Sequence, residues 1–433
     1  MTFWCEQAWL PGGIADAVAI EVADGRITSV TAGSPRSGTV LGGLTLPGFA
    51  NGHSHAFHRA LRGRTHHERG TFWTWRERMY SLAARLDPGT YYRLARGVYA
   101  EMVLGGYTSV GEFHYLHHAP GGKPYADPNA MGEALRQAAA DAGIRLTLLD
   151  TCYLAGGIGV EPDEVQRRFS DGTASAWAAR VGELKEADLF RVGGAIHSVR
   201  AVPADQLSEV DNAVPETRPL HIHLSEQRAE NEQCEAATGF TPTGLLWDHG
   251  VLGERLTVVH ATHLTDRDVR WLGEFRVGAC FCPTTERDLG DGIGPARALR
   301  DAGVRLGIGS DSNAVVDAFE ETRALELDDR LASEERGRFT AEELLAAGTD
   351  HTAVGWSEVG ALAVEQGADF VTVGLDSVRT AGIEPSGVLF AASGADVRHV
   401  VVAGREVVRD GAHLLIERPE TLLAKEIEAL WQS

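Results

Sequence analysis

Lysine, cysteine and long apolar runs are all scarce in this sequence. Three lysines occur among 433 residues, at Lys123, Lys185 and Lys425, and the formal net charge at pH 7 is −21. Nucleic acids and anionic membranes bind clustered positive charge, so this composition argues against either as a partner. No apolar run approaches the roughly 20 residues that span a bilayer, and the N-terminus lacks the basic start and apolar core of a signal peptide. We therefore expect a cytoplasmic protein that acts on a small molecule.

The five cysteines do not fit a disulfide framework or a zinc knuckle. Their number is odd and they are scattered, at Cys5, Cys152, Cys234, Cys280 and Cys282. Cys280 and Cys282 lie within an apolar run, and the second pair that a zinc knuckle needs is missing. We predict that both pack in the core.

Both ends of the chain alternate apolar and polar residues, as strands with one buried face do. The pattern is clear in 17–22 and 26–30, with Asp24-Gly25 as the turn between them. It returns in 370–375 and 397–408. We predict that residues 1–46 and 360–433 together form one small β-sandwich domain, which ends in a helix over 419–431.

Between these ends, short apolar strands alternate with helical segments, among them 131–142 and 266–273. The eight candidate strands are 45–49, 109–113, 145–149, 191–196, 220–224, 256–260, 277–282 and 305–308. Eight strands with crossover helices predict an α/β fold, a parallel (β/α)₈ TIM-like barrel over residues 47–359. The active site of such a barrel lies at the carboxyl ends of its strands.

His53 and His55 follow the first of these strands. In extended backbone, residues two apart point the same way, so both imidazoles can face one point in space. Neutral imidazole binds Zn, Fe, Ni and Cu, and a catalytic zinc keeps about three or four protein ligands with an exchangeable water. Taken alone, such a pair is more often two surface or packed histidines. The remainder of the chain reverses this preference.

Further polar residues stand at the carboxyl ends of other predicted strands. His197 and Arg200 follow the fourth strand, His223 and Glu226 end the fifth, His260 ends the sixth, and Asp311 follows the eighth. Each could be a core, turn or capping residue, but their joint appearance indicates one site. The loop over 58–76 is long and rich in Arg and His, which favours a lid or a substrate loop. We interpret the other histidines of this region as loop or rim residues: His66, His67, His114, His117 and His118.

These residues resemble the amidohydrolase superfamily, in particular its aminohydrolases with one metal. The superfamily motifs are His53-x-His55, His223-x-x-Glu226, His260 and the Ser-Asp-Ser around Asp311. More narrowly, the chain is similar over nearly its whole length to the formimidoylglutamate deiminase family of histidine degradation. The narrower likeness rests on the segments 72–76, 112–115, 197–200, 221–227 and 282–286.

The resemblance implies roles for particular residues. One Zn²⁺, with Fe²⁺ as the alternative ion, would be bound by His53, His55, His223 and Asp311. Protons would be handled by Glu226, His260 and Asp311, and the dicarboxylate substrate would be held by His58, Arg76, Tyr115, His197 and Arg200. His58 departs from the glutamine typical of relatives, and Asn313 stands where a histidine is common. The resemblance also implies a homodimer.

The implied reaction is the hydrolytic deimination of N-formimino-L-glutamate to N-formyl-L-glutamate and ammonia. Two-metal members of the superfamily usually bridge their ions with a carbamylated lysine after strand four, and residues 191–200 contain none, so we expect one metal. Bound zinc lowers the pKa of its water from about 15.7 toward 7. Asp311 would accept the proton of that water, His260 would orient the hydroxide, and Glu226 would protonate the departing nitrogen.

Several alternatives stay open. A related mononuclear aminohydrolase could act on a nucleobase or triazine, although an aromatic ring calls for stacking and amide groups, whereas this chain offers arginines, which suit carboxylates. A metal-binding homologue without catalysis and a barrel without any metal are two others. Substrate length is also open, because the aspartate analogue is shorter by one methylene, which is worth only about 1–3 kcal/mol in a pocket.

Overall fold

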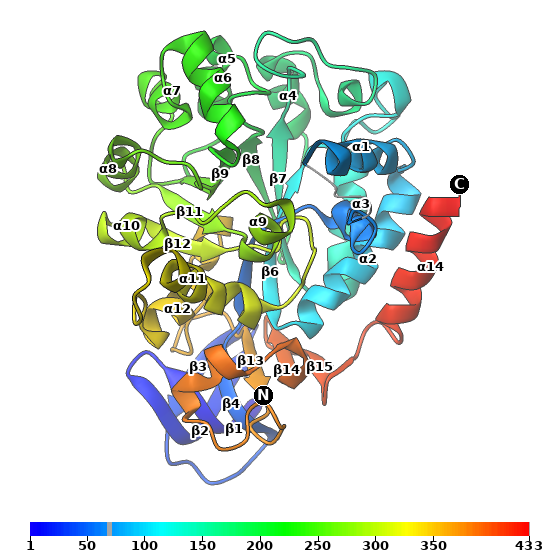
Figure 1. The fold of residues 1–433 in the computed structure, drawn as a ribbon. Helices are drawn as coiled ribbons and strands as arrows, with labels where there is room; N and C mark the ends of the chain where they lie inside the picture. Colours follow the sequence, from blue (N-terminus) through cyan, green and yellow to red (C-terminus); the bar gives the residue numbers. More distant parts are fainter. Residues whose placement is uncertain (67–71, 433) are drawn as a thin grey trace.

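The chain folds into a parallel barrel and a separate mixed sheet that is built from both of its ends (Figure 1). The computed structural model describes residues 1–66 and 72–432. The middle of the predicted substrate loop, including His67, lies outside these residues. Within the described part of the chain, the predicted fold class is confirmed.

The barrel strands are parallel and lie side by side in sequence order. They are β5 (Phe49–Ser54), β6 (Tyr107–His114), β7 (Arg145–Cys152), β8 (Phe190–Ile196), β9 (Leu220–Leu224), β10 (Leu256–His260), β11 (Gly278–Phe281) and β12 (Arg305–Ile308). Nearly all of their residues are buried, because one face meets the barrel interior and the other meets the surrounding helices. A parallel bridge between Ser54 and Asp311 brings the first strand to the end of the last. The carboxyl ends of these strands therefore gather on one face.

The first barrel strand is not where the sequence pattern predicts it. The strands predicted at 220–224, 256–260 and 305–308 have the observed bounds, but the prediction of a barrel strand over 45–49 is wrong. Residues 44–47 pair instead with 370–373 in the other sheet. The barrel strand β5 begins at Phe49 and contains the polar run Asn51-Gly52-His53, so a search for apolar runs passes over it.

The second sheet joins the two ends of the chain. Among the described residues its strands lie in the order β16-β15-β14-β13-β4-β1-β2-β3. They are β1 (Thr2–Leu10), β2 (Gly13–Ala23), β3 (Arg26–Thr31), β4 (Thr39–Pro47), β13 (Phe370–Val373), β14 (Val397–Val402), β15 (Arg405–Arg409) and β16 (Ala412–His413). The pair β1 and β4 is parallel, and the other neighbours are antiparallel. The predicted domain boundaries after residues 46 and 359 stay a prediction.

The helices surround the barrel and also cover the joint between the two sheets (Figure 1). They are α1 (Phe72–Ala83), α2 (Pro88–Leu104), α3 (Ala130–Ala142), α4 (Ala174–Val181), α5 (Ala204–Ala213), α6 (Arg228–Thr238), α7 (Pro242–Asp248), α8 (Asp266–Glu274), α9 (Pro283–Leu289), α10 (Ala296–Asp301), α11 (Ala318–Ser333), α12 (Ala341–Gly348), α13 (Val388–Ala391) and α14 (Pro419–Gln432). Within the ranges 1–66 and 72–432, no helix is both long and apolar enough to cross a bilayer.

The C-terminal helix α14 returns from the mixed sheet to the barrel and lies along α2 (Figure 1). Gly97 of α2 allows this approach, because a Cβ there would lie 2.8 Å from Leu423 of α14. The indole of Trp431 donates a hydrogen bond to the carbonyl of Ala60 at 2.9 Å. Ala60 belongs to the 3₁₀ turn Ala56–Leu61 that follows His55, so the end of the chain braces the segment after the first two histidines.

Candidate active site

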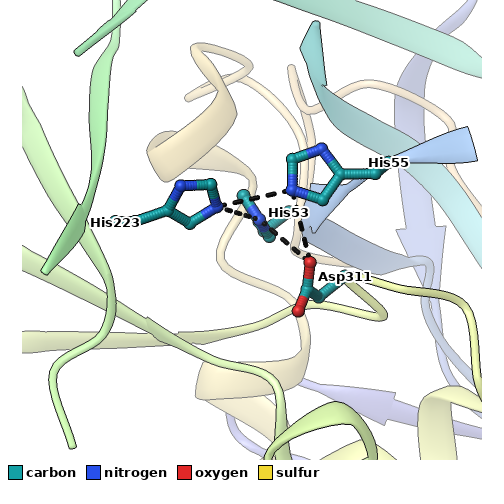
Figure 2. Close-up of side chains that lie close together, drawn as sticks. All are labelled: His53, His55, His223 and Asp311. Carbon is teal, nitrogen blue, oxygen red and sulfur yellow. Dashed lines mark hydrogen bonds and ion pairs between the residues drawn. The ribbon is translucent and has the colours of Figure 1, made fainter. Parts of the chain in front are cut away.

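Three imidazoles and one carboxylate converge at the carboxyl end of the barrel (Figure 2). The Nε2 atom of His223 lies 3.1 Å from Nε2 of His53 and 3.4 Å from Nε2 of His55. Oδ1 of Asp311 lies 3.4 Å from Nε2 of both His53 and His55. Tetrahedral ligands about 2.0–2.1 Å from a zinc ion lie roughly 3.3 Å from one another. These four contacts have the spacing of ligands around one ion, and all four ligand atoms lie within 4.8 Å of one another, so the side chains can bind a single metal.

Backbone hydrogen bonds across the barrel closure hold these ligands together. The N–H of Asp311 donates to the carbonyl of His53, and the N–H of His55 donates to the carbonyl of Asp311, each at 2.9 Å. The side-chain amide of Asn313 donates to the carbonyls of His55 at 3.0 Å and Asp311 at 3.2 Å, and its oxygen accepts from Ser310 at 2.8 Å. Asn313, at a position where histidine is common, thus has a structural role: it holds the backbones of two of the ligands in place.

The imidazoles have the tautomers and the charge state that metal ligands need. Nδ1 of His55 donates to the carbonyl of Phe113 and Nδ1 of His223 to that of His197, both at 2.9 Å, which leaves the Nε2 lone pairs facing the centre. Burial lowers the pKa of His53 to about 3 and keeps the pKa of His55 and His223 below the usual 6.5. The rings are therefore neutral at pH 7.

Asp311 completes the set as a carboxylate. Burial opposes its ionisation, but the hydrogen bond and charge of His53, with His260 and His55 nearby, hold its pKa below the usual 3.8. Its φ of 41° is in the left-handed region, a strained conformation that clusters at functional sites. Three neutral nitrogens and one carboxylate are a donor set that suits a divalent ion such as Zn²⁺, so these residues fit a mononuclear metal.

His260 stands beside this cluster between acidic groups. Its Nε2 lies 3.9 Å from Oδ2 of Asp311 and 3.9 Å from Oε1 of Glu226. Its Nδ1 lies 3.3 Å from Oε1 of Glu286, which also accepts the backbone N–H of Cys282 at 2.8 Å. Burial opposes protonation of His260, but the charges of Glu226 and of the other two carboxylates raise its pKa above 6.5.

The remaining predicted residues line the cleft in front of the cluster. The phenol of Tyr115 lies 2.8 Å from Nε2 of His58, and both are buried. Arg200 lies between two carboxylates, 3.6 Å from Glu226 and 3.8 Å from Glu230. Every predicted site residue except His53, which lies beneath the others, lines this cleft of about 890 Å³: His55, His58, Arg76, Tyr115, His197, Arg200, His223, Glu226, His260 and Asp311.

The sequence profile of the amidohydrolase family matches residues 44–407 of the chain. This chain belongs to the amidohydrolase family. Membership confirms the predicted resemblance and makes the protein a hydrolase of carbon–nitrogen bonds.

Known relatives match this amidohydrolase over nearly its whole length. It is 38% identical to a formimidoylglutamate deiminase of Pseudomonas aeruginosa, with 96% of each chain covered. It is 30% identical to a 5-methylthioadenosine/S-adenosylhomocysteine deaminase of Natronomonas pharaonis, with 92% of this chain and 89% of the relative covered. The crystal structure of an amidohydrolase from Brucella melitensis shares its fold with a TM-score of 0.93 and 33% identity, over 99% of both chains.

Sequence reasoning missed several groups at the site of this amidohydrolase. Glu286 and Glu230 contact His260 and Arg200, while Tyr153 forms part of the cleft wall and Gln166 donates a hydrogen bond to its hydroxyl. Glu286 ends the segment 282–286 that carried part of the resemblance, which was a usable signal. The others are single residues on a helix or in loops, and no periodic pattern marks them.

The interpretation of His114 as a loop or rim residue is wrong, because His114 ends strand β6, whereas His117 and His118 lie in the loop that follows, as predicted. All three are buried, at 4% exposure or less. His118 lies 3.0 Å from Asp171, and Nε2 of His117 donates to the carbonyl of Thr151 at 2.9 Å. They pack outside the barrel strands around an ion-pair network, so they are separate from the cleft. By contrast, the imidazole of His66 is exposed, as expected.

Proposed function

We propose that this amidohydrolase hydrolyses N-formimino-L-glutamate to N-formyl-L-glutamate and ammonia. The observation that carries the proposal is the presence of two arginines, Arg76 and Arg200, in the same cleft as the three-histidine and aspartate cluster. Arginine pairs with carboxylates in a bidentate geometry that other side chains do not reproduce. A metal centre for hydrolysis and two cationic anchors for a dicarboxylate are what this reaction requires. The 38% identity to a formimidoylglutamate deiminase supports the same substrate.

The ion that we propose for the cluster is one Zn²⁺, with Fe²⁺ as the alternative. Once bound by His53, His55, His223 and Asp311, it would supply Lewis-acid activation of a water for attack. Asp311 turns Oδ1 toward the imidazoles and Oδ2 toward His260. Oδ2 is therefore free of the ligand set and can accept the proton that the attacking water loses.

Proton delivery to the leaving nitrogen falls to Glu226. Its Oε1 and Oδ2 of Asp311 each lie 3.9 Å from the same nitrogen of His260, Nε2, so both acids are near the position where the formimino carbon would sit. His260 can donate a hydrogen bond to the attacking oxygen. The carbon–oxygen bond forms, the carbon–nitrogen bond breaks, and the nitrogen leaves as ammonia. General acid–base help of this kind contributes roughly 10²–10⁴ in rate.

The arginine donors of the cleft favour a carboxylate substrate over a neutral ring. Arg200 is already flanked by Glu226 and Glu230 at more than 3.5 Å, a spacing that leaves it able to turn toward a ligand. His58 and Tyr115 hold each other through one hydrogen bond, and His197 is packed edge-on against Tyr153 with ring centroids 4.6 Å apart.

We further propose that the protein is a homodimer and that it acts in the cytoplasm.

Substrate comparison by ammonia release tests the proposal. N-formimino-L-glutamate should be turned over in preference to N-formimino-L-aspartate, guanine, cytosine and 5-methylthioadenosine. Turnover of a nucleobase or nucleoside alone would overturn it in favour of a ring deaminase. Zinc removal with a chelator should abolish turnover and one equivalent of Zn²⁺ should restore it, and a protein that carries no metal and loses nothing to the chelator would contradict the metal assignment.

A further inference from the structure

One buried side-chain amide next to the cleft wall has an orientation that its neighbours fix. Gln166, which is 2% exposed, accepts the backbone N–H of Asp163 with its Oε1 at 2.9 Å. Because only the oxygen of the amide can accept that hydrogen bond, Nε2 must face the opposite way. Nε2 lies 2.8 Å from the hydroxyl of Tyr153 and 3.0 Å from that of Tyr80. Gln166 therefore donates to both phenols.

This arrangement leaves at least one tyrosine O–H for a ligand, even when one of the two phenols donates to the other. A phenol oxygen that accepts an N–H hydrogen bond keeps its own O–H for another partner. The hydroxyl of Tyr80 also accepts from Nε of Arg76 at 2.8 Å. Tyr80, Tyr153 and Arg76 all line the cleft, so this part of its wall presents donors and positive charge. A carboxylate, which only accepts hydrogen bonds, is the ligand that such a wall suits.

The ring of Tyr153 is held rigidly enough to aim its hydroxyl. Its edge packs against His197 with centroids 4.6 Å apart and against Phe169 with centroids 5.4 Å apart. The residue is 6% exposed. Burial also raises the pKa of Tyr153 above its usual 10, so the hydroxyl is protonated at neutral pH.

We propose that Tyr153 donates a hydrogen bond to one carboxylate of the substrate, and that Gln166 is a positioning residue that keeps the phenol in the donating orientation. Tyr153 and Arg76 then form a carboxylate subsite beside the one offered by Arg200. The identity of the carboxylate as part of N-formimino-L-glutamate rests on the proposed function, but the anion preference of this wall does not.

Steady-state kinetics of Tyr153→Phe test the first part. A hydrogen bond to a charged group is worth about 10- to 100-fold in affinity, so KM for N-formimino-L-glutamate should rise by that factor while kcat changes by less than about 3-fold. The matched control is Tyr92→Phe on helix α2, outside the cleft, which removes a hydroxyl that donates a hydrogen bond to Asp141 on helix α3. Comparison of the two monoamides of the substrate locates the contact: the penalty of Tyr153→Phe should vanish for one of them and persist for the other. An equal penalty with both monoamides, or none with the parent substrate, would overturn the proposal.

Substitution of Gln166 tests the positioning role. In Gln166→Glu a carboxylate replaces the amide and takes the tyrosine protons away from the cleft, whereas Gln166→Leu only removes the orienting group. KM should therefore rise more in Gln166→Glu than in Gln166→Leu, and Gln166→Glu should add little to Tyr153→Phe in the double variant. Equal effects of Glu and Leu, with additivity in the double variant, would mean that Gln166 serves the fold alone.

Ligand binding separates this inference from the proposed function. If the wild-type protein does not turn over N-formimino-L-glutamate, the proposed function fails, and calorimetric titration with glutarate still tests the subsite. Glutarate should bind the wild-type protein about 10- to 100-fold more tightly than it binds Tyr153→Phe. Equal affinity of the two proteins for glutarate would overturn the subsite whatever the substrate is.

Discussion

His55 and Asp311 are joined twice, once by their backbones and once by their side chains. The N–H of His55 donates to the carbonyl of Asp311 at 2.9 Å, and Nε2 of His55 lies 3.4 Å from Oδ1 of Asp311. The two residues are 256 positions apart, since one follows the first barrel strand and the other follows the last. The metal site and the closure of the barrel are therefore one structural unit, and we expect metal binding to stabilise the closed barrel.

The amide of Asn313 should control metal affinity without touching the metal. Asn313→Gly removes the hydrogen bonds to the backbone of His55 and Asp311 while keeping a residue that tolerates the φ of 55°. Loss of such an outer-shell partner typically costs 10- to 100-fold in metal affinity, and we expect Zn²⁺ affinity to fall by about that factor in chelator competition. Glu334→Gly, an exposed residue with a φ of 58°, is the control. Equal zinc affinity in both variants would contradict the proposed bracing role.

Arg200 should bind substrate through the geometry of its guanidinium and not through charge alone. Arg200→Lys keeps the charge but loses the planar donor pair, so we expect kcat/KM for N-formimino-L-glutamate to fall by about 10- to 100-fold. The fall should come mainly from KM. Arg218→Lys, which alters an ion pair with Glu186 outside the cleft, should leave both constants unchanged. Full activity of Arg200→Lys would remove Arg200 from the substrate site.

Glu230 should make the protein less stable as the pH rises. Burial raises the pKa of Glu230 to about 7; the positive charge of Arg200 opposes this rise and the negative charge of Glu226 adds to it. A group whose pKa is raised on folding binds its proton more tightly in the folded state, so its contribution is present below about pH 4.5 and is lost as the pH rises toward 7.

Substitution of Glu230 by glutamine should remove this dependence. The difference in free energy of unfolding between wild type and Glu230→Gln should shift against the wild type by on the order of 1–3 kcal/mol between pH 5 and pH 8, as measured by urea unfolding. Glu232→Gln, on the exposed face of the same helix, should show no such shift. A constant difference across this range would mean that Glu230 is ionised throughout.

The ion pairs of Arg180 should stabilise the outer layer of the barrel strongly. Its guanidinium contacts both oxygens of Asp150 at 2.8 and 2.9 Å and both oxygens of Asp171 at 3.0 and 2.8 Å, and all three side chains are at least nine-tenths buried. Arg180→Met leaves two buried carboxylates without their partner, which costs about 3–5 kcal/mol.

Acid should reduce the loss of stability that Arg180→Met causes. Burial opposes the ionisation of Asp150, but Arg180 lowers its pKa to about 2, so the stabilisation is present above pH 3.8 and is lost as the pH falls toward 2. The difference in the free energy of unfolding between wild type and Arg180→Met, measured with urea, should therefore become smaller below about pH 4. The partly exposed pair of Arg136 with Glu133 is the control, since Arg136→Met should cost less than about 1 kcal/mol. A similar cost for the two variants would contradict the assignment.

The strands of the barrel illustrate what a pattern of apolar residues can and cannot predict. Leu220–Leu224 and Leu256–His260 are apolar runs buried on both faces, and their bounds follow from the sequence. Thr45–Phe49 is an equally good run, yet most of it pairs with Phe370–Val373 in the mixed sheet. The choice between two sheets depends on contacts with residues more than 300 positions away, which no local pattern records.

Some residues of the site could likewise be predicted from the sequence, and others could not. Metal ligands at the ends of strands could be predicted because strand order fixes where those ends gather. Tyr153, Gln166 and Glu230 could not, because their roles depend on hydrogen bonds between a loop, a 3₁₀ turn and a helix. The burial of His114 and His117 also escaped prediction, since the sequence after a strand does not reveal which helix covers it.

By itself the sequence determined the kind of fold, the family and the residues able to hold a metal, because apolar period and motif spacing are local properties of the chain. Only the tertiary structure decided which strand closes the barrel, which acids flank His260 and which way the amide of Gln166 points. Those features depend on distances between side chains that are remote in sequence, and such distances exist only once the chain has packed.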